Sequence, residues 1–216
     1  MKTINYTKMS FGNWKSLLLA LCFLSILFSL PTTGMADPKS DYEKGSKAYQ
    51  RDDLVTAIDY LGSAAKADYK PAMVLLAYIY DKAEDNKTAL AWYKKAANGG
   101  SMAGALGLGQ MIASGNAGKI DNKKAFKWIS LAAKNNHPPA MTAMGFIYSK
   151  GELGLPIDNK KALSWFQKAA DKSYTPAMFE LSSSYRLGRL GLRKDPKKAA
   201  EIDQAIKNIV KMQKEP

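Results

Sequence analysis

The chain has almost none of the side chains from which metal sites and nucleophilic active sites are built. Its 216 residues include one cysteine, Cys22, and one histidine, His137. A zinc site needs three or four protein ligands, so His137 cannot form one by itself. It lies in a proline-containing turn, and we interpret it as an exposed loop residue. No Gly-x-Ser-x-Gly nucleophile elbow is present, so we expect neither a bound metal nor nucleophilic catalysis.

Phosphate-loop and glycosidase patterns are absent as well. The glycine-rich stretches 104–109 and 115–118 have no preceding strand pattern and no Gly-Lys-Ser/Thr ending, which a phosphate-binding loop requires. A glycosidase needs two carboxylates that face each other, whereas Glu152 is the one acidic residue of a long predicted loop. The sequence therefore predicts a protein that is not an enzyme and uses no cofactor.

The longest apolar run is too short to cross a bilayer comfortably. Leu17–Leu30 spans 14 residues, includes two serines and follows three lysines. A signal-peptide cleavage site is predicted after Ala36, with the small residues Gly34 and Ala36 at positions −3 and −1. This pattern predicts a signal peptide over residues 1–36 and export to the periplasm or the medium; an uncleaved anchor is the alternative. Cleavage would remove the only cysteine and leave a chain, residues 37–216, without a disulfide or a membrane span.

The charge is strongly unbalanced. The chain carries 32 basic and 19 acidic residues, a formal net charge of +13, which becomes about +10 without the three lysines of residues 1–36. This favours an acidic partner, either a protein surface or an anionic glycan. The lysines are scattered and no nucleic-acid-reading motif accompanies them, so we expect no nucleic-acid binding.

A block of alanines and bulky residues occurs four times. Within each block the five residues have the spacing 0, 3, 4, 7, 8, which places them on one stripe of a helix. The blocks begin 32, 36 and 37 residues apart, a period typical of an all-α array of stacked repeats. The blocks are Ala57–Tyr60–Leu61–Ala64–Ala65, Ala89–Trp92–Tyr93–Ala96–Ala97, Ala125–Trp128–Ile129–Ala132–Ala133 and Ala162–Trp165–Phe166–Ala169–Ala170.

A second helix is predicted in each repeat, before the block. It begins near Ala72, Gly104, Ala140 and Ala177, and a large and then a small residue follow four and five positions later. We name this helix A and the block-bearing helix B. An aspartate that is a favoured N-cap precedes helix B at Asp85, Asp121, Asp158 and Asp195. The lysine pairs that follow three of these aspartates are interpreted as a solvated face, with a repeated anion site as the alternative.

The combined pattern resembles the Sel1-like repeat, a relative of the tetratricopeptide repeat. Residues 139–175 fit best, with Met144, Gly145 and Tyr148 in helix A and Trp165 and Phe166 in helix B. The resemblance implies a right-handed superhelical solenoid of about five antiparallel helix pairs. The expected segments are an N-terminal cap over 38–70, repeats over 71–102, 103–138 and 139–175, and a C-terminal repeat or cap over 176–213.

The resemblance also implies a role. Such modules serve as interaction scaffolds in the bacterial envelope or at host cells, so we expect a partner peptide or protein in a concave groove lined by the A helices. The alternative is direct binding of an anionic envelope glycan. We expect Trp92, Trp128 and Trp165 to form core between repeats rather than a sugar-binding ladder. The aromatic groove residues could instead pack against a neighbouring repeat. The predicted groove residues are Tyr78, Lys82, Gln110, Phe146, Lys150, Phe179 and Arg186.

Overall fold

The computed structural model describes residues 37–214, and the predicted signal peptide lies outside them. The described part contains ten α-helices and no strand, which confirms the all-α class. The pairs are α2 (Pro38–Gln50) with α3 (Leu54–Lys66), α4 (Lys70–Lys82) with α5 (Asn86–Asn98), α6 (Met102–Ser114) with α7 (Asn122–Lys134), α8 (Pro138–Lys150) with α9 (Asn159–Ala170), and α10 (Thr175–Leu187) with α11 (Pro196–Lys214). A short 3₁₀ helix, η1 (Glu152–Gly154), lies in the loop between α8 and α9.

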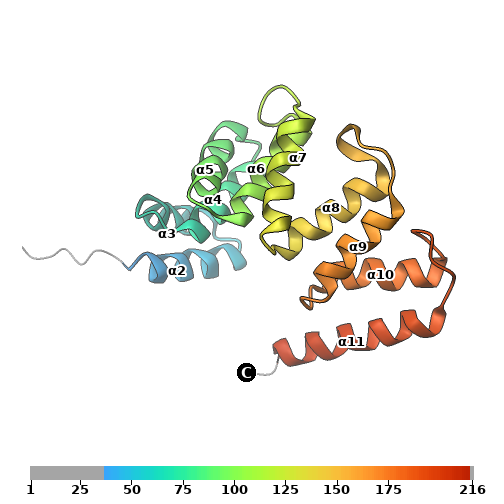
Figure 1. The fold of residues 1–216 in the computed structure, drawn as a ribbon. Coiled ribbons are helices and arrows are strands. Elements are labelled where there is room, and N and C mark those ends of the chain that lie inside the picture. Colours follow the sequence, from blue (N-terminus) through green and yellow to red (C-terminus); the bar gives the residue numbers. More distant parts are fainter. Residues whose placement is uncertain (1–36, 215–216) are drawn as a thin grey trace, which may run out of the picture. The chain divides into compact units, whose positions relative to one another are not determined.

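Each helix packs against the next one along the chain (Figure 1). The A helices α4, α6 and α8 also contact one another, so they form a second row beside the B helices. A repeat buries its apolar stripe only against its neighbours, which is the reason that the array holds together as one unit.

The two bulky residues of each block differ in burial. The second one (Leu61, Tyr93, Ile129, Phe166) is buried, with at most 6% of its surface exposed. The first one is partly buried, and Trp92, Trp128 and Trp165 pack against the edge of the core. The three tryptophans therefore belong to the packing between repeats, as expected.

The small residue of helix A permits the close contact that buries the second bulky residue. A Cβ added to Gly145 would lie 2.6 Å from the Phe166 ring, and one added to Gly109 would lie 2.7 Å from Ile129. Gly45 of α2 has the same relation to Leu61, at 2.7 Å. The first helix pair thus keeps the glycine contact of the interior repeats although the rest of its helix A pattern is weak.

The predicted N-caps are present. Each of Asp85, Asp121, Asp158 and Asp195 accepts a hydrogen bond from the backbone N–H three residues later, at 2.9–3.1 Å. Asp53 caps α3 in the same way. The side chains of Lys124 and Lys161 turn back and pair with the capping carboxylates at 3.1 and 3.0 Å. These contacts favour the interpretation of the lysine pairs as a solvated face over a repeated anion site.

The last helix pair has a polar network at one position where the interior pairs have an apolar contact. Asp203 of α11 stands where the interior B helices carry their second bulky residue, and Ser182 of α10 stands where the interior A helices carry glycine or alanine. The Ser182 hydroxyl donates to the Asp203 carboxylate at 2.5 Å, and Arg186 forms an ion pair with the same carboxylate. At this position, charge and hydrogen bonds join α10 and α11, while Leu181 and Ile206 of the same two helices are buried apolar residues.

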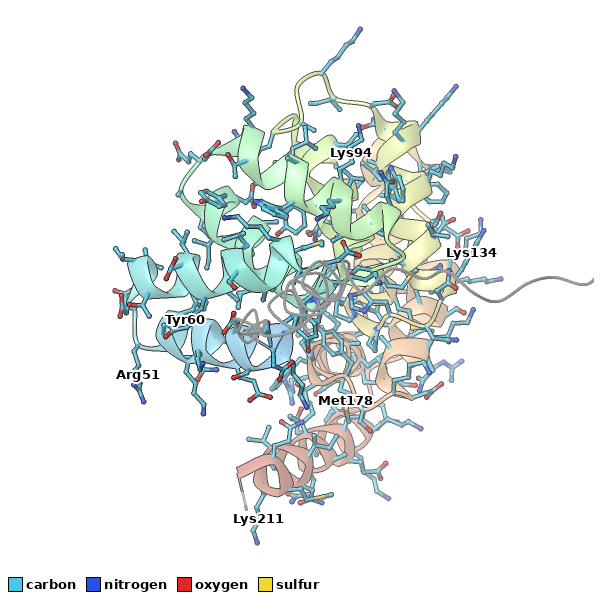
Figure 2. The ribbon with its side chains drawn as sticks, turned by 90° about the vertical axis from the view of Figure 1, so that its left-hand side faces the viewer. Arg51, Tyr60, Lys94, Lys134, Met178 and Lys211 are labelled. Carbon is cyan, nitrogen blue, oxygen red and sulfur yellow. The ribbon has the colours of Figure 1, made fainter. Side chains whose placement is uncertain are left out.

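The positive charge lies on the surface. No lysine or arginine between residues 37 and 213 is buried, and Arg51 and Lys211 project outward in Figure 2. Between residues 37 and 214, no helix combines the length and the apolar character that a bilayer crossing requires.

Candidate functional site

Two hollows lie side by side on the face formed by the A helices. The first has a volume of about 550 Å³ and is lined mainly by α4 and α6. The second has a volume of about 700 Å³ and is lined mainly by α6, α8 and the loop that contains η1. Gln110 of α6 lines both hollows, so they adjoin, and we call the two together the A-helix groove.

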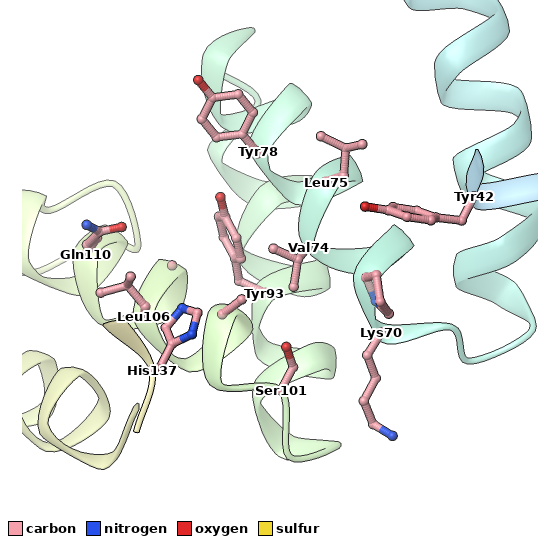
Figure 3. Close-up of a pocket in the computed structure, with 13 residues that line it drawn as sticks. Tyr42, Lys70, Val74, Leu75, Tyr78, Tyr93, Ser101, Leu106, Gln110 and His137 are labelled. Carbon is pink, nitrogen blue, oxygen red and sulfur yellow. The ribbon is translucent and has the colours of Figure 1, made fainter. Parts of the chain in front are cut away.

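The wall of the first hollow is mostly apolar. Val74 and Leu75 of α4, Leu106 of α6 and the Tyr93 ring line it (Figure 3). A Cβ on Gly107 would lie 2.3 Å from the Tyr93 ring, so the glycine is required for the ring to lie there. Burial, with smaller effects of Asp81 and Tyr78, raises the pKa of the Tyr93 phenol to about 12. Tyr93 is therefore a neutral hydroxyl at physiological pH.

The polar end of the first hollow is formed by residues at the starts of the A helices. Lys70 begins α4, Ser101 caps α6 through its hydroxyl, and His137 occupies the N-cap position of α8. His137 is partly buried, and this burial lowers its pKa, which keeps the imidazole neutral at pH 7. His137 lies outside the helices, as predicted for a loop residue, but it is partly buried and not exposed. The helix that starts directly after it turns the side chain toward the groove.

The second hollow is built around Phe146. The Phe146 ring is partly buried and meets the Phe166 ring edge-on, with 5.1 Å between centroids. The Lys150 ammonium lies 5.1 Å above the Phe146 ring and pairs with Glu152 at 3.7 Å. Leu153 reaches the same hollow from the η1 loop in a left-handed backbone conformation, φ 57°, which is strained for leucine.

The structure brings most of the predicted groove residues together. Tyr78, Gln110, Phe146 and Lys150 line the two hollows, and the Lys82 ammonium lies 5.4 Å above the Tyr78 ring. Phe179 and Arg186 of α10 lie outside both hollows; Phe179 is 57% exposed and Arg186 is held by Asp203.

The alternative interpretation of the aromatic residues applies in part. Phe146 packs against the Phe166 ring, and Tyr78 meets Tyr49 of α2 at 6.4 Å between ring centroids. Both rings nevertheless leave part of their surface to the hollows, because Tyr78 is 39% exposed and Phe146 is only partly buried. Sequence reasoning did not select Leu75, Gly107 or His137 as groove residues. A signal was present for His137, since Tyr69, Ser101 and Tyr174 hold the same position before the other A helices.

The groove carries hydrogen-bonding and cationic groups around an apolar floor, a chemistry suited to binding a polypeptide. Among residues 37–214, no cluster of three or more His, Cys, Asp or Glu side chains could hold a metal ion.

Comparison with known proteins places this architecture among characterised folds. The Sel1 repeat profile matches residues 38–69, 70–101, 103–137, 138–174 and 175–201. A Sel1 repeat protein from Oxalobacter formigenes has a similar structure, with a TM-score of 0.71 and 26% identity over 78% of this chain and 70% of that one. A protective antigen of uropathogenic Escherichia coli gives a TM-score of 0.61 with 29% identity, over 86% of this chain and 41% of the antigen.

A yeast protein shares part of the sequence. The chitin synthase regulator SKT5 of Saccharomyces cerevisiae is 30% identical over 107 residues, which are 48% of this chain. The match covers only 15% of the yeast protein.

Proposed function

Because the chain belongs to the Sel1 repeat family, whose members generally act as scaffolds for protein–protein interaction, we propose that it is a non-catalytic adaptor that binds a segment of a partner protein in the A-helix groove. The observation that carries the proposal is the pair of adjoining hollows on successive A helices, joined at Gln110. An extended segment that follows the row of A helices would pass through both hollows.

The groove suits a segment with apolar side chains and acidic flanks. The two hollows offer apolar walls at Val74, Leu106 and Phe146. The Gln110 side chain between them has both a donor and an acceptor for a peptide backbone. Lys82 lies at the C-terminal end of α4, near the Tyr78 ring, where it would attract a carboxylate of the partner. Lys150 holds the same place in α8 but is already paired with Glu152.

The place of action is part of the proposal. The signal-like pattern of residues 1–36 supports export, and an exported adaptor would meet an envelope protein or a host protein. The yeast relative is named as the regulator of an enzyme, which supports a partner that is itself an enzyme.

Capture from envelope extract followed by quantitative binding tests the proposal. The full chain without residues 1–36 is used as bait, and the affinity of the captured protein is then measured for variants. Tyr78→Ala removes an aromatic ring from the first hollow and should weaken binding by about 1–3 kcal/mol, a typical effect for a central aromatic anchor. Gln110→Ala should also weaken binding, because the amide serves both hollows.

The matched control is Phe179→Ala, which removes an exposed ring of α10 that lies outside the groove. We expect this variant to bind like the parent protein. Unchanged affinity in Tyr78→Ala and Gln110→Ala, with folding intact by circular dichroism, would reject the groove as the binding site.

A further inference from the structure

A third hollow, of about 470 Å³, lies where α7, α8 and α9 meet, away from the residues of the A-helix groove. Its floor is apolar: Met141 of α8 is 3% exposed, and Trp165 of α9 is partly buried. Three lysines stand around it: Lys134 at the end of α7, Lys168 near the end of α9 and Lys172 in the following turn. We call this site the tryptophan pocket.

The lysines of the tryptophan pocket have no acidic partner. Among the described residues, no carboxylate lies within ion-pair distance of Lys134, Lys168 or Lys172. The one acidic lining residue, Asp171, accepts a hydrogen bond from the Gln167 amide at 2.8 Å. The Lys168 ammonium lies 4.6 Å from the centroid of the Trp165 ring. The pocket therefore has an excess of positive charge next to an aromatic surface.

The first junction of the array shows that this excess is not a general property of the repeat. There, Trp92 and Lys95 of α5 hold the places of Trp165 and Lys168, and the Lys95 ammonium pairs with Asp68 at 3.6 Å. The corresponding residue of the tryptophan pocket is Asn136, which shares the left-handed backbone of Asp68, with φ 63° and 64°. At the later junction an amide stands where the first junction has the neutralising carboxylate.

Helix electrostatics explain only part of the lysine cluster. Each of the B helices α3, α5, α7 and α9 has a lysine in its last turn, where a cation interacts favourably with the helix dipole. This accounts for Lys134 and Lys168. It accounts neither for Lys172, which follows α9, nor for the loss of the carboxylate at Asn136.

We propose that the tryptophan pocket binds a phosphate ester carried on a sugar. Ammonium groups act as point charges for phosphate, and three of them around one hollow match a dianion better than a single carboxylate. Trp165 and Met141 offer an apolar surface to the C–H face of a sugar ring, and the hollow is larger than a phosphate ion alone requires. The same ester group occurs in free sugar phosphates and in phosphorylated envelope glycans.

Isothermal titration calorimetry with glucose 6-phosphate at low ionic strength tests the site, since screening weakens exposed charge pairs at high salt. We expect binding of glucose 6-phosphate that is at least about tenfold tighter than that of glucose, because each charge-assisted hydrogen bond contributes roughly that factor. Inorganic phosphate should bind more weakly than the ester, since it leaves the apolar floor uncovered. No heat of binding with glucose 6-phosphate, or equal affinity for glucose, would overturn the proposal.

Variants identify the pocket within the chain. Asn136→Asp restores the carboxylate of the first junction and should lower the affinity about tenfold, as should Lys172→Gln. The control is Lys95→Gln, the same type of change at the junction that is already neutralised, and it should leave the affinity unchanged. Equal affinities in all three variants would overturn the assignment to this pocket.

Two further measurements separate the sources of the ester and the two proposals. Co-sedimentation with purified cell wall, before and after removal of its phosphorylated polymers, distinguishes a glycan ligand from a free sugar phosphate. Capture of the protein partner should be unaffected by Asn136→Asp, because the residue lies outside the A-helix groove. If glucose 6-phosphate does not bind, the proposed adaptor function is unaffected. If no protein partner is captured, the proposed sugar phosphate site is likewise unaffected.

Discussion

The glycine contact between helices A and B gives a sharp test of how the repeats pack. In Gly145→Ala the new Cβ would lie 2.6–2.7 Å from three atoms of the Phe166 ring, a distance at which the ring must move. Phe166 is 1% exposed and already in contact with Phe146, so it has little room to retreat. Overpacking of this kind costs about 1–3 kcal/mol. The better helix propensity of alanine returns about 0.5–1 kcal/mol, which leaves a net loss of about 0–2.5 kcal/mol.

Gly62 of α3 provides the matched control, because a Cβ added there meets no atom within 4 Å. Gly62→Ala should therefore raise the free energy of unfolding by about 0.5–1 kcal/mol. Urea unfolding followed by circular dichroism measures both variants. A second check is Gly145→Ala combined with Phe166→Leu, in which the loss should be smaller than the sum of the single losses, since the two residues touch. Equal shifts in Gly145→Ala and Gly62→Ala would refute the close-contact reasoning.

Three further predictions concern burial, pH and export. Ala169 is fully buried, so Ala169→Asp should lower the free energy of unfolding by about 3 kcal/mol or more. Lys168→Asp, on the exposed face of the same helix, should lower it by less than about 1 kcal/mol. Equal effects of the two variants in thermal melts would contradict the helix register. Backbone hydrogen bonds lower the pKa of the Asp121 and Asp158 carboxyl groups in the folded protein. Both charged caps therefore stabilise the fold fully at pH values above the pKa of the same groups in the unfolded chain. This stabilisation is lost as the pH falls through the pKa of the folded protein. The melting temperature should thus fall between about pH 4 and pH 2, and less steeply in the Asp121→Asn/Asp158→Asn variant, whose amides keep the cap but do not titrate. N-terminal sequencing of the exported protein should give Asp37 as the first residue. An intact Met1 would instead favour an uncleaved N-terminal anchor.

Much of the fold was predictable because the repeat makes the same contacts several times. The alanine spacing located the B helices, and Asp121 and Asp158 marked their starts through capping chemistry. The spacing could not say which bulky residue is buried, since Trp165 and Phe166 lie on opposite flanks of one stripe. Phe166 is the buried residue because it packs against Gly145 of the neighbouring helix, and a contact between two helices cannot be read from the spacing within one of them.

The candidate site was less predictable for a physical reason. A hollow depends on where side chains are missing or displaced, and Gly107 and the strained Leu153 create such places through contacts distant in sequence. Of the groove positions implied by the resemblance, Tyr78, Gln110 and Phe146 line the two hollows, and their role in binding a partner stays a prediction. The resemblance also implied Phe179, whose place in the last helix pair lies beyond the two hollows.

The polar contact between Ser182 and Asp203 limits how the array can change in length. Interior helix pairs share one kind of contact, in which Gly109 meets Ile129 and Gly145 meets Phe166, so gene duplication could copy a unit such as residues 139–175 and splice it beside the original without a new kind of interface. The last pair cannot be copied inward in this way. The Asp203 side chain is 32% exposed, and a further A helix packed against α11 would take this surface out of water, which is costly for a carboxylate. The polar contact between Ser182 and Asp203 therefore suits a helix pair that keeps one side in water.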